Sequence, residues 1–409
     1  MTSPTLDPRR LLLLALAAAP LAVACTGADL GAAETDEQTG ATGIFIDPSS
    51  SSEGGEQSPE LPAQCALEAF TCPHVLRTPV MLVLDNSYSM RAERVGVWDH
   101  DGDDADDDGL VDGDPAQLAT PRVTRWRSLH GELKMMSALF GDRLEIGATL
   151  FPAFDRTAGA DAPLCSVSAT PEIPLGADWE GMVLDRKIPF SIDNVPGGAA
   201  PAAAAIDTAL AALADRHAEL PGAIVLITDG AANCGSEPGA YDERLLAVVT
   251  AAQARGIPTF VVGIDIPTGI VTPIADWLPD GVVGVDIRAA LSGLAEAGGT
   301  ARPGDVKFFA ADDQPALGSA LAVIAKETTS CLIQFDVPLD EDTYTLASLR
   351  ITTQDGQSQV YGAQPVADCA TESGWRFAGD RAHIELCGDA CTLHQAGGSL
   401  WFAVGCVGS

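Results

Sequence analysis

Short runs of apolar residues alternate along the middle of the chain with longer segments in which apolar residues recur at helical spacing. Residues 80–84 and 223–227 are continuous runs of Val, Leu, Ile, Met and Ala, which is typical of strands buried on both faces of a parallel sheet. Further strands are predicted at residues 144–151, 259–264 and 306–310, and helices at residues 123–140, 200–214, 241–255, 287–297 and 314–327. The alternation predicts an α/β fold with a doubly wound, mainly parallel, Rossmann-like sheet.

The pattern changes after Cys331, where the apolar segments become short and rich in β-branched and aromatic residues. Strands are expected at residues 332–337, 343–346, 349–352, 383–386 and 400–404. Asp355-Gly356 is typical of a hairpin turn. We therefore expect residues 330–409 to form a small antiparallel β domain, with the role of a spacer or cap, or alternatively of a surface for a partner.

Polar side chains follow the first two buried strands at the point where each strand ends. Asp85, Ser87 and Ser89 follow the first strand with the spacing Asp-x-Ser-x-Ser, and Asp229 follows the second. Right-handed crossovers place the carboxyl ends of such strands at one edge of the sheet, where ligands bind in folds of this class. Hard cations such as Mg²⁺ prefer oxygen ligands, so these residues predict a metal site.

The Asp-x-Ser-x-Ser motif after a buried strand resembles the metal-ion-dependent adhesion site of von Willebrand factor type A domains, over about residues 76–329. The resemblance implies that Ser87 and Ser89 bind Mg²⁺ or Mn²⁺ directly, that Asp85 acts mostly through water, and that Asp229 contributes from the second strand. It also implies a protein partner, because in this family an Asp or Glu of the partner often completes the coordination of the metal.

The sequence departs from the family at one ligand. The Thr that the family supplies from a second loop aligns with Ala199 or Ala200, which precede an Ala-rich helix. We expect a weaker site, in which water or a carboxylate of the partner fills the gap. The alternative is a fossil site that binds no metal.

An acidic insertion at residues 99–115 follows the motif closely. Asp99–Asp114 contains nine Asp in sixteen residues, and charges packed so closely repel unless a cation neutralises them. Its Asp-x-Asp-x-Asp-Gly core resembles the calcium loops of thrombospondin type 3 repeats and dockerins, which implies Ca²⁺ ligands at Asp104, Asp106, Asp108 and Asp112. Pro115 stands where an EF-hand has Glu. The alternative is a solvated acidic loop.

The N-terminus has the pattern of an export signal. Arg9 and Arg10 precede an apolar run to Ala24, which is short for a membrane span. The residues Leu21-Ala-Val-Ala-Cys25 resemble a bacterial lipobox, which implies a lipid on Cys25 as the only membrane anchor. A signal peptide (1–24) and a disordered linker (25–64) would then precede the type A domain (65–329). We expect an exported protein of the cell envelope, an outer-membrane lipoprotein or alternatively a periplasmic or secreted protein.

Ten cysteines fit an exported chain with disulfides. The pairs expected are Cys65 with Cys72, and Cys165 with Cys234 between two loops on the metal face. The remaining cysteines would staple the C-terminal domain, without a predicted connectivity: Cys331, Cys369, Cys387, Cys391 and Cys406.

The net charge and the absence of catalytic motifs limit the classes of function that the sequence supports. A net charge of −34 argues against nucleic acid or an anionic membrane surface as a partner. The six His lie in no zinc spacing, and no Gly-x-Ser-x-Gly or phosphate-binding loop occurs, so we expect no enzyme. The leading hypothesis is an exported adhesion or binding module with a divalent-metal face. The alternatives are a metal-independent envelope scaffold and, with less support, a secreted hydrolase.

Overall fold

The structure is a computed structural model of the 409-residue chain. It describes the chain in segments between residues 74 and 406, which are residues 74–91, 98, 123–153, 165–176, 184, 188, 199–214, 220, 222–235, 240–270, 282–335, 338–339, 344–353 and 355–406.

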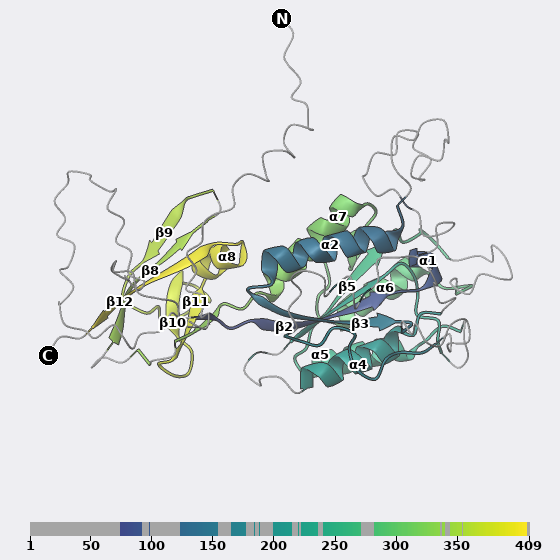
Figure 1. Ribbon diagram of the computed structural model, residues 1–409, viewed down its shortest axis with the longest axis horizontal. Coiled ribbons are helices and arrows are strands. Elements are labelled where there is room, and N and C mark those ends of the chain that lie inside the picture. The colour runs from purple at the N-terminus through teal and green to yellow at the C-terminus, as the bar shows by residue number, and fades with distance from the viewer. Residues whose placement is uncertain are drawn as a thin grey trace, which may run out of the picture.

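A five-stranded parallel sheet forms the centre of the larger part of the molecule (Figure 1). Its strands lie in the order β3-β2-β4-β5-β6, and every pair of neighbours is parallel. The strands are β2 (Thr78–Asp85), β3 (Leu144–Phe151), β4 (Ala223–Thr228), β5 (Thr259–Ile264) and β6 (Phe309–Ala311). The doubly wound α/β fold predicted from the sequence is confirmed.

Helices cover both faces of this sheet. The helices α2 (Arg125–Phe140) and α7 (Gln314–Thr328) pack on one face. The other face is covered by α4 (Ala202–Ala214), α5 (Arg244–Ala254) and α6 (Ile287–Ala297). Alternate residues of β2 enter the two cores, as Leu82 packs with α2 and Val83 with α4. This burial on both faces explains why the strand sequence is apolar without alternation.

Polar caps fix where several helices begin. Asp286 accepts a hydrogen bond from the backbone N–H of Ala289 at 3.0 Å, and Thr124 accepts one from Arg127 at 3.2 Å. The predicted bounds of β5 and α6 agree with the structure. The strand β6 begins at Phe309 instead of residue 306, and in the segment before it the N–H of Arg302 donates to the carbonyl of Lys307.

The C-terminal part is a separate antiparallel region with two small sheets (Figure 1). One sheet has the order β1-β7-β11-β10 and the other the order β12-β8-β9. The strands are β1 (His74–Val75), β7 (Leu332–Gln334), β8 (Tyr344–Thr352), β9 (Ser358–Tyr361), β10 (Gly374–Phe377), β11 (His383–Cys387) and β12 (Ser399–Cys406). Buried residues of both sheets, among them Ile333 and Leu349, belong to one hydrophobic cluster.

Several features of this region differ from the sequence prediction, among them the strands β9 and β10, which were not predicted. The segments expected as two strands at 343–346 and 349–352 form the single strand β8. The helix α8 (Asp389–Gln395) was not predicted. The strand β1 precedes the parallel sheet in sequence, yet it pairs with β7 of the C-terminal sheet. The described part of the chain therefore begins in the C-terminal antiparallel region, then forms the parallel sheet with its helices, and then returns to the antiparallel region.

Candidate functional site

The predicted metal-site residues lie at the centre of the parallel sheet's carboxyl edge. The strand β2 ends at Asp85 and its neighbour β4 ends at Thr228, with Asp229 next in the chain. The chain leaves β2 toward β3 on one side, whereas β4 lies on the other side of β2. Such a reversal is the switch point at which open α/β sheets leave a crevice for ligands.

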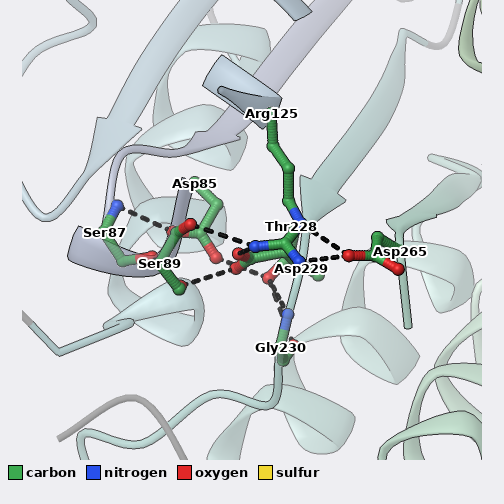
Figure 2. A network of polar contacts seen from close by, with 8 residues as sticks. All are labelled: Asp85, Ser87, Ser89, Arg125, Thr228, Asp229, Gly230 and Asp265. Atoms are coloured by element: carbon green, nitrogen blue, oxygen red, sulfur yellow. Dashed lines mark hydrogen bonds and ion pairs between the residues drawn. The ribbon is translucent and has the colours of Figure 1, made fainter. Parts of the chain in front are cut away.

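Hydrogen bonds join the two strand ends (Figure 2). Oδ1 of Asp85 accepts a bond from the backbone N–H of Ser87 at 2.9 Å, and the hydroxyls of Ser87 and Ser89 are 3.0 Å apart. The Ser89 hydroxyl donates to Oδ1 of Asp229 at 2.9 Å. The structure thus brings together all four residues that the sequence analysis assigned to the site at the strand ends.

Thr228 supports Asp85 from the neighbouring strand, a role that the sequence analysis missed. Its hydroxyl donates to Oδ2 of Asp85 at 2.5 Å and accepts the backbone N–H of Gly230 at 3.2 Å. The sequence carried a signal for this contact, because Thr228 is the polar end of an otherwise apolar strand directly before Asp229. The bond fixes the orientation of the Asp85 carboxylate.

The carboxylates of Asp85 and Asp229 are buried, and burial makes the charged form of a carboxyl group unfavourable. Asp85 is 1% exposed, and its burial, followed by the charge of Asp229, raises the pKa of Asp85 to about 7. Burial likewise raises the pKa of Asp229, despite the opposing effect of the nearby Arg125 guanidinium. Neighbouring buried carboxylates need a proton or a cation to offset their charge.

The donor set fits a hard divalent cation. Asp85, Ser87, Ser89 and Asp229 offer carboxylate and hydroxyl oxygens, the ligand types that Mg²⁺ and Mn²⁺ take. Among the residues that the structure describes, no group of three or more His, Cys, Asp and Glu side chains is arranged to hold a metal.

An arginine between two carboxylates adjoins the site and was not predicted. Nη1 of Arg125 lies 3.5 Å from Oδ2 of Asp229 and donates to the carbonyl of Ser89 at 3.2 Å. Nε of the same guanidinium donates to Oδ2 of Asp265 at 3.1 Å, and Nη2 bonds the same oxygen. Asp265 directly follows β5, so a strand ending in Asp was the signal available in the sequence.

The loop that lacks the expected Thr is held by its backbone. Ala199 is 1% and Ala200 6% exposed. The Asn233 side chain accepts a hydrogen bond from the N–H of Ala200, and the N–H of Asn233 donates to the Ala200 carbonyl at 3.2 Å. Asn233 therefore holds this loop beside the turn after β4, although neither alanine offers a side-chain ligand.

Three disulfides are present in the described part of the chain. Cys165 pairs with Cys234, which confirms the pairing expected between two loops on the metal face. The C-terminal region contains two more, Cys331–Cys391 and Cys369–Cys387. The remaining predicted cysteine positions lie outside the residues or side chains that the structure describes, namely Cys25, Cys65, Cys72 and Cys406.

Other predicted features also fall outside the described residues. They are the acidic loop with Asp104, Asp106, Asp108 and Asp112, the signal peptide and the linker. Within the described part of the chain, every helix is too short or too polar to span a membrane.

Comparisons with known proteins give structural matches only. No family model matches the chain, and no curated protein matches it. Solved structures with similar folds include the conserved hypothetical protein BatB from Bacteroides thetaiotaomicron, at 17% identity and a TM-score of 0.35 over 61% of this chain and 99% of that one. The pilus adhesin SpaC from Lactobacillus rhamnosus GG, in its open conformation, matches at 11% identity and a TM-score of 0.41, over 81% of this chain and 39% of that one.

A third match is proximal thread matrix protein 1 from the mussel byssus, described with a zinc-occupied MIDAS motif. Its identity is 12% and its TM-score 0.34, over 64% of this chain and 50% of that one. These identities and scores assign neither family nor activity.

Proposed function

We propose that this chain is an exported binding module that engages a protein partner through a divalent-cation face. The observation that carries the proposal is the hydrogen bond from Ser89 to Asp229, which joins the Asp-x-Ser-x-Ser turn to the second strand end. It gathers hard oxygen donors at the switch point of the sheet, where ligands of such folds bind. The cation proposed is Mg²⁺, or Mn²⁺ with the same ligands.

In this proposal, each residue of the site has its own role in holding the cation. Ser87 and Ser89 would face the cation with their hydroxyls, while Asp85, held by Thr228, would act through water. Asp229 would supply the carboxylate from the second strand. A bound cation would supply a positive centre for an oxygen of the partner, and the alanines at the Thr position favour a partner that brings a carboxylate.

Two further parts of the proposal rest on the sequence. The acidic loop would hold Ca²⁺ through Asp104, Asp106, Asp108 and Asp112, and Cys25 would carry a lipid. Deleting residues 99–114 is expected to remove most of the calcium measured by calorimetry; unchanged stoichiometry would contradict the calcium loop. Incorporation of a palmitate analogue into the wild type but not into Cys25→Ser would support lipidation, and equal labelling would contradict it.

Metal binding at the strand ends is tested by titrating the full chain with Mg²⁺. Asp229→Asn keeps the size of the side chain and removes its charge, so we expect at least about tenfold weaker binding, which corresponds to about 1.4 kcal/mol. Asp207→Asn is the matched control, because Asp207 is exposed and pairs with Arg244 at 3.3 Å on the helix surface. Equal affinities of the wild type and Asp229→Asn would contradict the proposal.

The same variants separate the binding module from the scaffold alternative. A metal-dependent module loses stability and partner capture when EDTA is added, and Asp229→Asn reproduces that loss. A metal-independent scaffold is indifferent to both changes and sensitive instead to substitutions in the C-terminal β region.

A further inference from the structure

Arg125 occupies an electrostatically unfavourable place in its helix. It is the first residue of α2, directly after the N-cap Thr124. The N-terminus of a helix carries partial positive charge, so a basic side chain there costs a few tenths of a kcal/mol unless nearby acids offset it. The side chain is only 13% exposed. A local conflict of this kind indicates that a contact elsewhere in the fold holds the residue.

The contacts of Arg125 lead to the metal face. The guanidinium lies between two carboxylates, those of Asp229 and Asp265, and Nη1 also donates to the Ser89 carbonyl (Figure 2). Arg125 therefore contacts the Asp-x-Ser-x-Ser turn and the ends of β4 and β5 together. The guanidinium lies nearer to Asp265 than to Asp229: Nε is 3.1 Å from Oδ2 of Asp265, whereas Nη1 is 3.5 Å from Oδ2 of Asp229.

Asp265 has an unusual backbone conformation for its role. Its φ is 49°, which is a left-handed conformation that Asp adopts more readily than most residues, and its N–H bonds the Ala311 carbonyl at 2.8 Å. Residues held in such regions are fixed by surrounding contacts and gather at functional positions. Here the conformation accompanies the ion pair with Arg125.

The formal charges limit what Arg125 can do. Asp229 and Asp265, the two carboxylates in contact with Arg125, bring two negative charges when ionised against its one positive charge, which leaves −1 before Asp85 is counted. One guanidinium therefore lowers the repulsion between the carboxylates but leaves charge for a divalent cation to offset. Like charges a few ångströms apart repel, so the guanidinium also weakens the binding of that cation.

We propose that Arg125 is an internal counter-ion of the metal face, which stabilises the joined strand ends when no divalent cation is bound. Its second consequence, a weakened affinity for the cation, rests on the proposed function. Arg125 is thus a positioning residue: it acts on the site through Asp229 and Ser89, and Asp265 holds its guanidinium.

The melting temperature of the full chain in EDTA tests the counter-ion role. We expect Arg125→Gln to melt roughly 3 °C or more below the wild type, because it leaves a buried carboxylate without its cation. Arg125→Lys keeps the charge without the planar fork and should recover at least half of that loss. Arg244→Gln removes an exposed surface ion pair and should change little.

Each result decides the matter. An unchanged melting temperature in Arg125→Gln, or no recovery in Arg125→Lys, would overturn the counter-ion role. Titration with Mg²⁺ is the second readout: at least roughly tenfold tighter binding by Arg125→Gln supports the role, and equal or weaker binding contradicts it. If neither protein binds Mg²⁺, the proposed function fails, while the melting temperatures in EDTA still decide the role of Arg125.

Discussion

Ser89 donates a hydrogen bond to Asp229 at 2.9 Å, and this contact joins two turns whose residues lie 140 positions apart in the chain. The bond forms because β2 and β4 are neighbours in the sheet and their carboxyl ends reach the same edge. It shows that the hydroxyl and the carboxylate point toward one another.

The first prediction concerns this hydroxyl. Ser89→Ala should weaken Mg²⁺ binding at least about tenfold, because it removes one proposed ligand and the link to Asp229. Its melting temperature in EDTA should fall by less than about 2 °C, since Ser89 is only partly buried. Calorimetry and thermal melting measure the two effects. The control is Ser292→Ala, which removes a hydroxyl that accepts a hydrogen bond from the backbone N–H of Lys307. A large loss of stability with unchanged affinity would assign Ser89 a structural role.

The second prediction follows from the raised pKa of Asp85. The folded protein holds a proton on Asp85 up to about pH 7, whereas the unfolded chain loses it near the ordinary value of 3.8. The folded state therefore binds more protons between these values, so the free energy of unfolding in EDTA should fall as the pH rises from about 4 to about 7. The loss should be of the order of a few kcal/mol, measured by urea denaturation.

Asp85→Asn separates the effect of the Asp85–Asp229 pair from that of His394 in the same pH range. Burial lowers the pKa of His394 to about 4, so that group adds stability as the pH rises and works in the opposite direction. The difference between the wild type and Asp85→Asn cancels the contribution of His394. A difference that is independent of pH would contradict the raised pKa of Asp85. Saturating Mg²⁺ should flatten the difference, because a cation favours the ionised carboxylate.

The sequence predicted the strand ends because their signal is local. A continuous apolar run followed by Asp-x-Ser-x-Ser reports a buried strand and its polar end within twelve residues, Pro79 to Met90. The same holds for Asp229, and parallel order then implies that the ends meet. Arg125 could not be predicted in this way, because its contacts depend on how α2 begins against the sheet edge and no motif surrounds it.

The C-terminal region was harder to predict for a different reason. The strand β1 has only two residues, which is too short for any periodicity, and its partner β7 follows some 257 residues later in the chain. The single strand β8 was expected as two strands, since residues 347 and 348 are the small residues Ala and Ser. Long-range pairing, unlike an apolar run, leaves no pattern in neighbouring residues.

The third prediction concerns the disulfide between Cys165 and Cys234. It closes a loop with a sequence separation of 69, and its removal in the double variant to Ala should cost about 2–4 kcal/mol in urea denaturation. Cys234 follows Asn233, which holds the backbone of Ala200, so the variant should also bind Mg²⁺ more weakly.

The Cys369–Cys387 disulfide provides a matched comparison, because it closes a shorter loop of separation 18 in the C-terminal region. Its removal should cost roughly 1 kcal/mol less by the loop-entropy argument and leave the affinity for Mg²⁺ unchanged. Equal losses of affinity in both double variants would mean that the effect is global, and that the first disulfide has no particular role at the metal face.

The fourth prediction restores the missing ligand. Ala200 packs in the hydrophobic cluster with α4 and α5, whereas Ala199 belongs to none of the clusters among the described residues. Ala199→Thr is therefore the substitution expected to add a hydroxyl at the site and to tighten Mg²⁺ binding about tenfold, or about 1.4 kcal/mol. Ala200→Thr should instead lower the melting temperature, because it forces a larger polar side chain into a packed core, and leave the affinity unchanged. Calorimetry with both variants measures the outcome. Tighter Mg²⁺ binding by Ala200→Thr alone would mean that position 200, and not position 199, faces the site. Unchanged affinity in both folded variants would mean that the loop lies too far from the strand ends to supply a ligand.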